Sequence, residues 1–420
     1  MKNSTSWIDR NLKFLQKIFV IFLCVIILIN KFTLSFFDPN PPLSKIAIYF
    51  MYFLYVGSIV CAVIFFYFRT LFIQLTFIVV FLIVIDLIIS LFTERIGHKE
   101  FRIQQPEPYI NAEYFSKDFI DESFAQPGGW LLDKTYGGVK PNNFEGNWIN
   151  VRNNQRVTVN DSGNYLHKIY LFGGSTVYNG EVPDNFTIAS QLASLGANNF
   201  SYKVVNMGAT SIHSAQQFGR LKAEINLSDG DVIIFYDGVN DVLQRIIYGN
   251  HEGYMIGNPK KESFWIRQLR SKNKYSSILF IFYSKIIENT KETPSTLINT
   301  SVDNYVNTLA AVNKYVKSQG GSFYHFLQPT LFTKKNLNEY EKLLIEKGYP
   351  FVPAQFIQDF KRAYPLISDK LDTVEFSYSL VDAFNNLEKS PYLDFCHVTH
   401  IGNKIIAENI WNKINNKLKL

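Results

Sequence analysis

The chain has 420 residues, of which 47% are hydrophobic and only 19% are charged, and its 37 Phe and 24 Tyr make it unusually aromatic. This apolar surplus predicts that part of the chain lies in a membrane. The formal net charge of +6 is spread thinly, without a Lys/Arg block or aromatic residues interleaved with basic ones, which argues against nucleic acid as a partner. Only Cys396 of the three cysteines lies outside the apolar segments, so no disulfide framework is available to the polar part of the chain.

The apolar surplus is concentrated before residue 93 and predicts a membrane anchor over residues 1–93 with three transmembrane helices. Residues 46–68 and 71–92 are long enough, at 1.5 Å per residue, to cross a hydrocarbon core of roughly 30 Å. Residues 14–37 have a shorter apolar part whose flanking lysines can snorkel to the interfaces. A cleaved signal peptide is the alternative for this first segment, but no small-residue cleavage site follows it.

Charges around the spans indicate a sidedness. Lys2, Arg10, Lys13 and Lys17 precede the apolar part of the first span, and Arg69 lies between the second and third spans, which favours a cytoplasmic N-terminus and an extracytoplasmic globular domain. The opposing charges, which would then lie outside, are Lys31, Lys45, Arg95, Lys99 and Arg102. Asp86 lies within the third span, where an ionisable group suggests a functional partner. The alternative is a neutral or hydrogen-bonded carboxyl group packed between helices.

Residues 94–166 are polar and rich in Pro and Gly turns, and we expect them to form a connector that packs on the following domain. Residues 148–151 and 156–159 are strand-like and indicate a small hairpin. From residue 167 to 420 the pattern changes to alternating strands and helices. This alternation predicts an α/β fold in which a parallel sheet lies between layers of helices.

The strands of this sheet are expected at residues 167–172, 202–207, 231–236 and 322–327, and helices at 185–196, 214–225, 304–318, 351–365 and 404–413. Ligands of such sheets bind beyond the carboxyl ends of the strands. Three strands end in polar or glycine-containing turns, so we expect these turns to meet at one edge: residues 173–175, 207–209 and 237–241.

Ser175 follows an apolar strand and two glycines, and near the other end of the chain Asp394 and His397 lie three residues apart. A serine on a tight turn, an imidazole and a carboxylate are the parts of a nucleophilic acyl-transfer site. Ser175 would attack an ester carbonyl, His397 would act as general base and acid, and Asp394 would fix the imidazole tautomer. Taken singly, Ser175 reads as a turn or cap residue and Asp394 as a cap of the final helix.

Four separated blocks resemble the SGNH (GDSL-like) hydrolases: Phe172-Gly-Gly-Ser175-Thr, Val204-Val-Asn-Met-Gly208-Ala, Tyr236-Asp-Gly-Val-Asn240-Asp, and Asp394-Phe-Cys-His397-Val-Thr. The likeness covers roughly residues 167–417 and implies a three-layer α/β/α, flavodoxin-like domain in a membrane-anchored, bacterial-type member. It also implies an oxyanion hole built from the backbone N–H groups of Ser175 and Gly208 and the side-chain amide of Asn240. Gly174 departs from the family, which has Asp there, and this bears on the substrate class more than on the mechanism.

Other residues near the blocks carry weaker signals. Tyr178, His213 and Asp241 are candidates for the pocket lining, with Asp241 also suited to capping the following helix. His400, three residues after His397, raises the idea of a metal site with Asp394, but no further Cys/His cluster supports it, and neither metal nor cofactor is expected. Cys396 is a rival nucleophile, yet we expect neighbouring side chains to point apart and Cys396 to be structural.

Residues 242–301 form an aromatic insertion, which is expected either to cover the site as a lid, to dock on the sheet or the membrane, or simply to add core. The function that these observations favour is a membrane-tethered serine esterase that removes O-acyl groups, with O-acetyl as the expected group, from an envelope glycan or glycolipid. An acyltransferase that uses the same serine is an alternative, and it would need a separate membrane partner because three spans are too few for an acyl-donor channel. A glycan-binding or assembly subunit without turnover is a further alternative.

Overall fold

The structure is a computed structural model that describes residues 107–109, 112–125, 129–159, 165–196, 202–243, 293–346 and 354–418, together with Phe14 and Phe81. The three expected transmembrane helices, Asp86 and residues 244–292 of the expected insertion lie outside the described residues. In the part of the chain that the structure describes, no helix combines the length and apolar character needed to span a bilayer.

Within the described residues, eight strands form one sheet in the order β10-β9-β8-β6-β7-β5-β4-β3, and β1 and β2 form a separate antiparallel pair. The strands are β1 (Trp130–Asp133), β2 (Gly138–Pro141), β3 (Phe144–Glu145), β4 (Asn150–Arg152), β5 (Gln155–Arg156), β6 (His167–Gly173), β7 (Tyr202–Gly208), β8 (Val232–Asp237), β9 (Ser322–Leu327) and β10 (Ser377–Ser379).

The centre of the sheet consists of five parallel strands, β7-β6-β8-β9-β10. Numbered along the chain, this order is 2-1-3-4-5, the flavodoxin-like order of doubly wound sheets. Strand β8 reads Val-Ile-Ile-Phe-Tyr-Asp and all six residues are buried, because a parallel strand covered on both faces must be apolar on both. The predicted α/β fold with a mostly parallel sheet is therefore confirmed.

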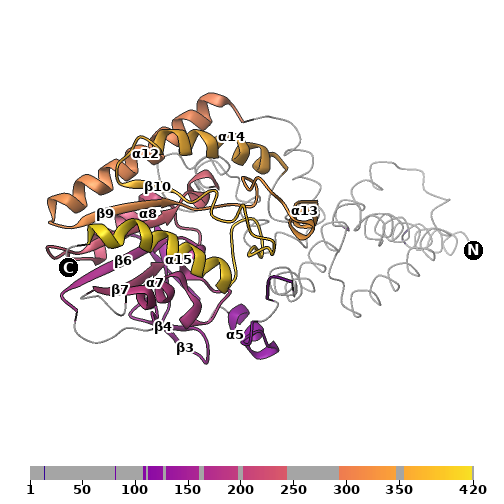
Figure 1. Ribbon diagram of the computed structural model, residues 1–420, viewed down its shortest axis with the longest axis horizontal. Helices are drawn as coiled ribbons and strands as arrows, with labels where there is room; N and C mark the ends of the chain where they lie inside the picture. Colours follow the sequence, from indigo (N-terminus) through magenta and orange to yellow (C-terminus); the bar gives the residue numbers. More distant parts are fainter. Residues whose placement is uncertain are drawn as a thin grey trace, which may run out of the picture. The chain divides into compact units, whose positions relative to one another are not determined.

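Helices cover both faces of the sheet (Figure 1). Helices α7 and α15 pack together against one face, and α12 packs with α8 and α14 on the other. The helical segments are η1 (Glu107–Tyr109), α5 (Lys117–Ala125), α6 (Ser175–Tyr178), η2 (Asp184–Phe186), α7 (Ile188–Gly196), α8 (Ser214–Glu224), α9 (Val239–Asp241), α12 (Ser295–Ser318), α13 (Glu339–Glu346), α14 (Ala354–Leu371), α15 (His400–Ile414) and η4 (Asn415–Lys417).

Helix α12 corrects one predicted boundary. It begins at Ser295, directly after Pro294, and not near residue 304, so residues 295–301 belong to a core helix and not to an insertion. Ile298 and Val302 are each 1% exposed and lie in the main hydrophobic core. The fixed φ of Pro294 suits the position before the first turn, a signal that the aromatic content of the preceding stretch obscured.

Part of the expected connector belongs to the same sheet. Strands β3, β4 and β5 extend it in antiparallel fashion, and β5 joins β7 where Arg156 lies opposite Asn206. Arg156 is fully buried, and its Nε donates to Asp184 Oδ1 at 2.7 Å. A buried guanidinium needs a partner, because its desolvation would otherwise cost several kcal/mol. Residues 144–156 thus have fixed contacts with the segment that follows α6.

Candidate active site

The three glycine-containing and polar turns meet at the carboxyl edge of the sheet. The register places Gly173 of β6 opposite both Gly208 of β7 and Tyr236 of β8. The backbone N–H of Ala209 also donates to the carbonyl of Gly173 at 3.2 Å. Ser175 and Asn240, which follow β6 and β8, are consequently neighbours.

Ser175 is half-buried at the start of α6, and its Oγ lies 2.7 Å from Nε2 of His397. On the other side of the imidazole ring, Nδ1 lies 2.8 Å from Oδ2 and 3.0 Å from Oδ1 of Asp394. Both His397 and Asp394 are buried. With Nδ1 protonated toward the carboxylate, Nε2 is the acceptor for the Ser175 hydroxyl. The three side chains form a Ser–His–Asp array.

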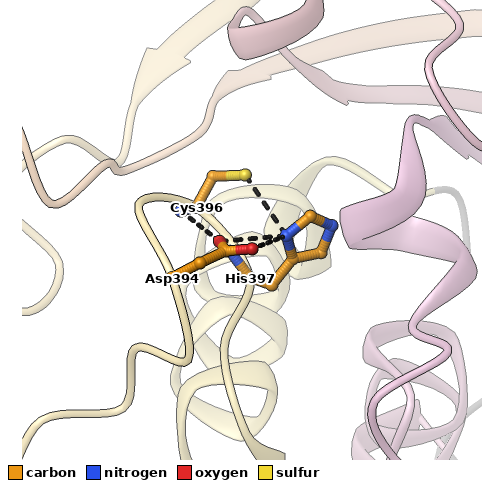
Figure 2. Close-up of side chains that lie close together, drawn as sticks. All are labelled: Asp394, Cys396 and His397. Atoms are coloured by element: carbon orange, nitrogen blue, oxygen red, sulfur yellow. Dashed lines mark hydrogen bonds and ion pairs between the residues drawn. The ribbon is translucent and has the colours of Figure 1, made fainter. Parts of the chain in front are cut away.

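A short loop aims the acid and the imidazole together (Figure 2). Oδ1 of Asp394 accepts the backbone N–H groups of Cys396 at 2.9 Å and His397 at 2.8 Å, while both carboxylate oxygens face Nδ1. The loop is closed by a bridge between Tyr392 and Val398. Because several donors surround the carboxylate, it is held in the orientation that fixes the imidazole.

Each of the two glycines before Ser175 occupies a position where a side chain would clash, and the clashing neighbours differ. A Cβ on Gly173 would lie 2.3 Å from Cγ2 of Val177 and 2.5 Å from the carbonyl oxygen of Tyr236. A Cβ on Gly174 would lie 2.2 Å from Nδ2 of Asn240. The departure of Gly174 from the family pattern therefore leaves the space in which the Asn240 amide approaches the nucleophile turn.

Two of the three expected oxyanion donors are suitably placed. Ser175 is the first residue of α6, where the backbone N–H has no acceptor within the helix. Nδ2 of Asn240 donates to the carbonyl of Ile212 at 2.9 Å, which leaves its second N–H for a ligand. Both groups lie at the turn that carries the nucleophile.

The structure does not support Gly208 as the third donor. Its N–H donates to Oδ1 of Asn206 at 2.9 Å. A Cβ on Gly208 would lie 2.2 Å from the backbone nitrogen of Tyr178 and 2.6 Å from the carbonyl carbon of Val177. Gly208 is thus required for the close packing of β7 against α6, and not for the approach of a substrate.

Ser211 is a better candidate, and the sequence reasoning missed it. It has a left-handed backbone with φ of 56° and precedes Ile212, the acceptor for Asn240. Its backbone N–H makes no hydrogen bond within the described residues. Ser211 also lines a cavity of about 230 Å³, together with Leu132, Gly137, Gly138, Val139, Ile212 and Gln216. A serine in the left-handed region carries no sequence signal, because Gly and Asn are the residues usually expected there.

The three weaker pocket candidates make contacts within the fold. The Asp241 carboxylate accepts the hydroxyl of Ser214 at 2.5 Å and its N–H at 3.1 Å, so it caps α8 rather than the helix that follows it. His213 is fully buried at the start of α8. Tyr178 is buried against the Trp130 ring, 4.8 Å away, and under the Arg156 guanidinium. These contacts stabilise the segments around the site.

Cys396 does not point away from His397 as expected. Its Sγ lies 3.5 Å from Nδ1, on the side of the ring that faces Asp394 (Figure 2). Ser175 meets the other ring nitrogen, Nε2. Asp394, Cys396 and His397 have ligand atoms within 4.8 Å of one another, but binding a cation there would displace the hydrogen bond that orients the ring. His400 takes no part in this cluster, because its Nδ1 is bonded to the Tyr114 hydroxyl at 3.0 Å.

Comparisons with known proteins give only distant structural similarity. No family model and no curated protein sequence matches the chain. Among solved structures, the acetyl xylan esterase AlAXEase is 16% identical, with a TM-score of 0.35, over 59% of this chain and 99% of that one. TesA is 14% identical, with a TM-score of 0.32, over 59% and 98% of the two chains. Axe2, an acetylxylan esterase from Geobacillus stearothermophilus, is 14% identical, with a TM-score of 0.32, over 60% and 95%. Such low identities and scores decide neither activity nor substrate.

Proposed function

We propose that this chain is an SGNH-type serine esterase. The observation that carries the proposal is the continuous contact from Ser175 Oγ to His397 Nε2 and from His397 Nδ1 to Asp394, in a buried loop at the carboxyl edge of the sheet. Nucleophile, base and orienting acid are within hydrogen-bond reach of one another, which is the geometric requirement for nucleophilic acyl transfer.

The reaction follows from these contacts. His397 takes the proton of Ser175 as Oγ attacks the ester carbonyl, and Asp394 stabilises the resulting imidazolium. The proton then passes to the leaving alcohol as the ester C–O bond breaks, which leaves an acyl group on Ser175. Water attacks this intermediate with His397 again as base, and the acid and the free serine are released.

The negative charge on the carbonyl oxygen needs donors that are in place before the reaction. We assign this role to the backbone N–H of Ser175 and the amide of Asn240, with Ser211 N–H as the third candidate in place of Gly208. Donors fixed by α6 and by the Ile212 carbonyl need little reorganisation as the charge develops.

The proposed substrate is an O-acylated glycan or glycolipid of the cell envelope, and acetyl is the proposed acyl group. Support comes from the sequence: residues 46–68 and 71–92 are long apolar segments, and an enzyme held by such an anchor meets substrates at the membrane or wall. The same charges that favour a cytoplasmic N-terminus favour an extracytoplasmic domain.

Covalent labelling tests the proposed nucleophile. Full-length protein treated with a serine-directed fluorophosphonate is expected to gain one adduct at Ser175, located by peptide mass spectrometry, and Ser175→Ala is expected to gain none. Hydrolysis of 4-nitrophenyl acetate should be lost in the same variant. An unlabelled Ser175 in protein with normal stability would instead favour a binding or assembly subunit.

A further inference from the structure

Glu181 is a buried carboxylate that faces the catalytic imidazole but has no part in the array described above. Its Oε1 lies 3.8 Å from Nε2 of His397, on the side of the ring that also meets Ser175. Glu181 is 8% exposed. A charged side chain is rarely buried without a function or a strong structural reason.

The backbone around Glu181 is held by side chains from the segment before β6. Five consecutive carbonyl oxygens, those of residues 178–182, accept hydrogen bonds from the side chains of three residues. Arg156 donates to Tyr178 (3.5 Å), Asn179 (3.3 Å) and Val182 (2.9 Å), Ser123 donates to Gly180 (2.6 Å), and Tyr109 donates to Glu181 (3.0 Å). A loop fixed at every carbonyl places its side chain reproducibly, as a catalytic group requires.

The distance of 3.8 Å between Oε1 of Glu181 and Nε2 of His397 limits what Glu181 can do. It is too long for a direct hydrogen bond, so Glu181 is not a second orienting acid. A single oxygen atom can still lie within roughly 2.8 Å of both Nε2 and Oε1. Once Ser175 is acylated, Nε2 no longer accepts its proton and is able to accept one from that oxygen. Water has two hydrogens for the two acceptors, whereas an alcohol has only one.

We propose that Glu181 binds the hydrolytic water and so commits the acyl-enzyme to hydrolysis rather than to transfer. One water hydrogen points to Nε2 and the other to Glu181, which directs an oxygen lone pair at the acyl carbon. The water oxygen bonds to that carbon, its proton passes to Nε2, and the second hydrogen remains on oxygen. The bond from carbon to Ser175 Oγ then breaks, and His397 returns the proton to the serine.

An alcohol acceptor in the same place would direct its alkyl group or a lone pair toward the carboxylate. Such a group donates no hydrogen bond to the carboxylate, so an alcohol makes one favourable contact fewer than water and the site disfavours transfer. This inference depends on the proposed esterase function and goes further, because it selects the acyl acceptor.

The test measures how acetyl-Ser175 partitions in the full-length protein. 4-Nitrophenyl acetate is supplied with and without methanol, and acetate, methyl acetate and nitrophenol are quantified. The nitrophenolate leaving group needs no proton, so acylation should change less than deacylation. In Glu181→Gln we expect deacylation to slow roughly ten- to a hundredfold, a visible nitrophenol burst, and a methanolysis-to-hydrolysis ratio about tenfold higher.

Two further variants separate this role from a structural one. Tyr109→Phe removes the donor to the Glu181 carbonyl and should shift the ratio in the same direction by a smaller factor. Glu339→Gln, the same change at a side chain that is 88% exposed, should match the wild type. An unchanged ratio and burst in Glu181→Gln, with acetyl-Ser175 detected by mass spectrometry, would overturn the inference about Glu181. A failure of every variant and the wild type to form acetyl-Ser175 would overturn the esterase proposal itself.

Discussion

The residues that the structure describes include two Ser–His–Asp arrays, and these differ in ways that bear on function. The first is Ser175, His397 and Asp394 at the edge of the sheet. The second is Ser377, His325 and Asp237, in which the Ser377 hydroxyl lies 2.7 Å from Nδ1 of His325 and Oδ1 of Asp237 lies 3.2 Å from Nε2. The residue types are thus the same in both, but the two ring nitrogens exchange partners: the serine meets Nε2 in the first array and Nδ1 in the second.

The second array lies in the interior of the domain. Its three members come from β10, β9 and β8, and the Tyr305 hydroxyl of α12 is inserted 2.5 Å from Oδ1 of Asp237 and 2.8 Å from Nε2 of His325. Burial, and then the charge of Asp237, raise the pKa of Tyr305 well above its usual value, so this hydroxyl stays a donor to the carboxylate. Oδ2 of Asp237 has no partner among the described residues.

The comparison shows that the triad contacts alone do not make an active site. Ser175 follows a glycine turn at the carboxyl edge, is half-buried and has the Asn240 amide close by. Ser377 is buried at the start of β10, the strand at one end of the sheet, where it lies opposite His325 of β9. We infer that the interior array ties three neighbouring strands together, close to the turn that carries Asn240, and that only the array at the carboxyl edge can meet a substrate.

The sharpest way to break this comparison is to remove each serine in turn. Ser175→Ala should lower kcat for 4-nitrophenyl acetate by roughly 10⁴-fold or more, because the covalent route is lost. Ser377→Ala should retain kcat within about twofold while the protein becomes less stable by about 1 kcal/mol. Both variants are compared by their turnover and their urea midpoints. A Ser377→Ala variant that lost activity without losing stability would contradict the assignment of catalysis to Ser175 and of a structural role to Ser377.

The Asn240 amide is the next largest difference between the arrays. Asn240→Ala is expected to lower kcat by about a hundredfold or more, with little change in KM, since an oxyanion donor acts mainly in the transition state. Asn240→Asp provides the matched control, because it keeps the size but puts an acceptor where a donor is needed, and it should be at least as slow. Losses below about threefold in both variants would remove Asn240 from the oxyanion hole.

Much of the fold could be predicted from local patterns in the sequence. The strands β6 to β9 are apolar, β-rich runs, and they lie within one residue of the predicted positions. Strand β10 is only three residues long and includes two serines, so no run marked it. The start of α12 was displaced because the aromatic stretch before it masked the signal of Pro294.

The site likewise has residues that the sequence could predict and residues that only the structure reveals. Ser175, Asn240, Asp394 and His397 carry side chains with recognisable chemistry, and the structure brings them together at one edge. The commitment of the Gly208 N–H to Asn206 depends on a contact between a backbone group and a side chain two residues away, which no letter pattern specifies. Glu181 becomes visible only when the chain folds and places it beside His397 across 216 positions of sequence, from 181 to 397.

A substitution at Tyr305 tests whether the interior array contributes to stability rather than to catalysis. Tyr305→Phe keeps the ring but leaves Asp237 with only the longer contact to His325, and an under-satisfied buried carboxylate costs roughly 1–3 kcal/mol. We expect a lower urea midpoint with an unchanged m-value, and kcat within about threefold of the wild type. Tyr315→Phe, a change at a partly buried tyrosine of the same helix that packs at the edge of the core, is the control and should unfold close to the wild type.

The smallest expected effect concerns His400, which lies outside both arrays. Burial lowers the pKa of His400 below its usual value, so the folded state binds a proton less readily than the unfolded chain. Its contribution is therefore fully present above about pH 6.5 and is lost as the pH falls toward the lowered pKa. His400→Phe keeps a ring against Tyr114 and Phe186 but cannot titrate. Urea midpoints of the wild type should fall more steeply between about pH 7.5 and pH 5 than those of the variant, and parallel pH dependences would contradict a contribution of His400 to the acid sensitivity of the fold.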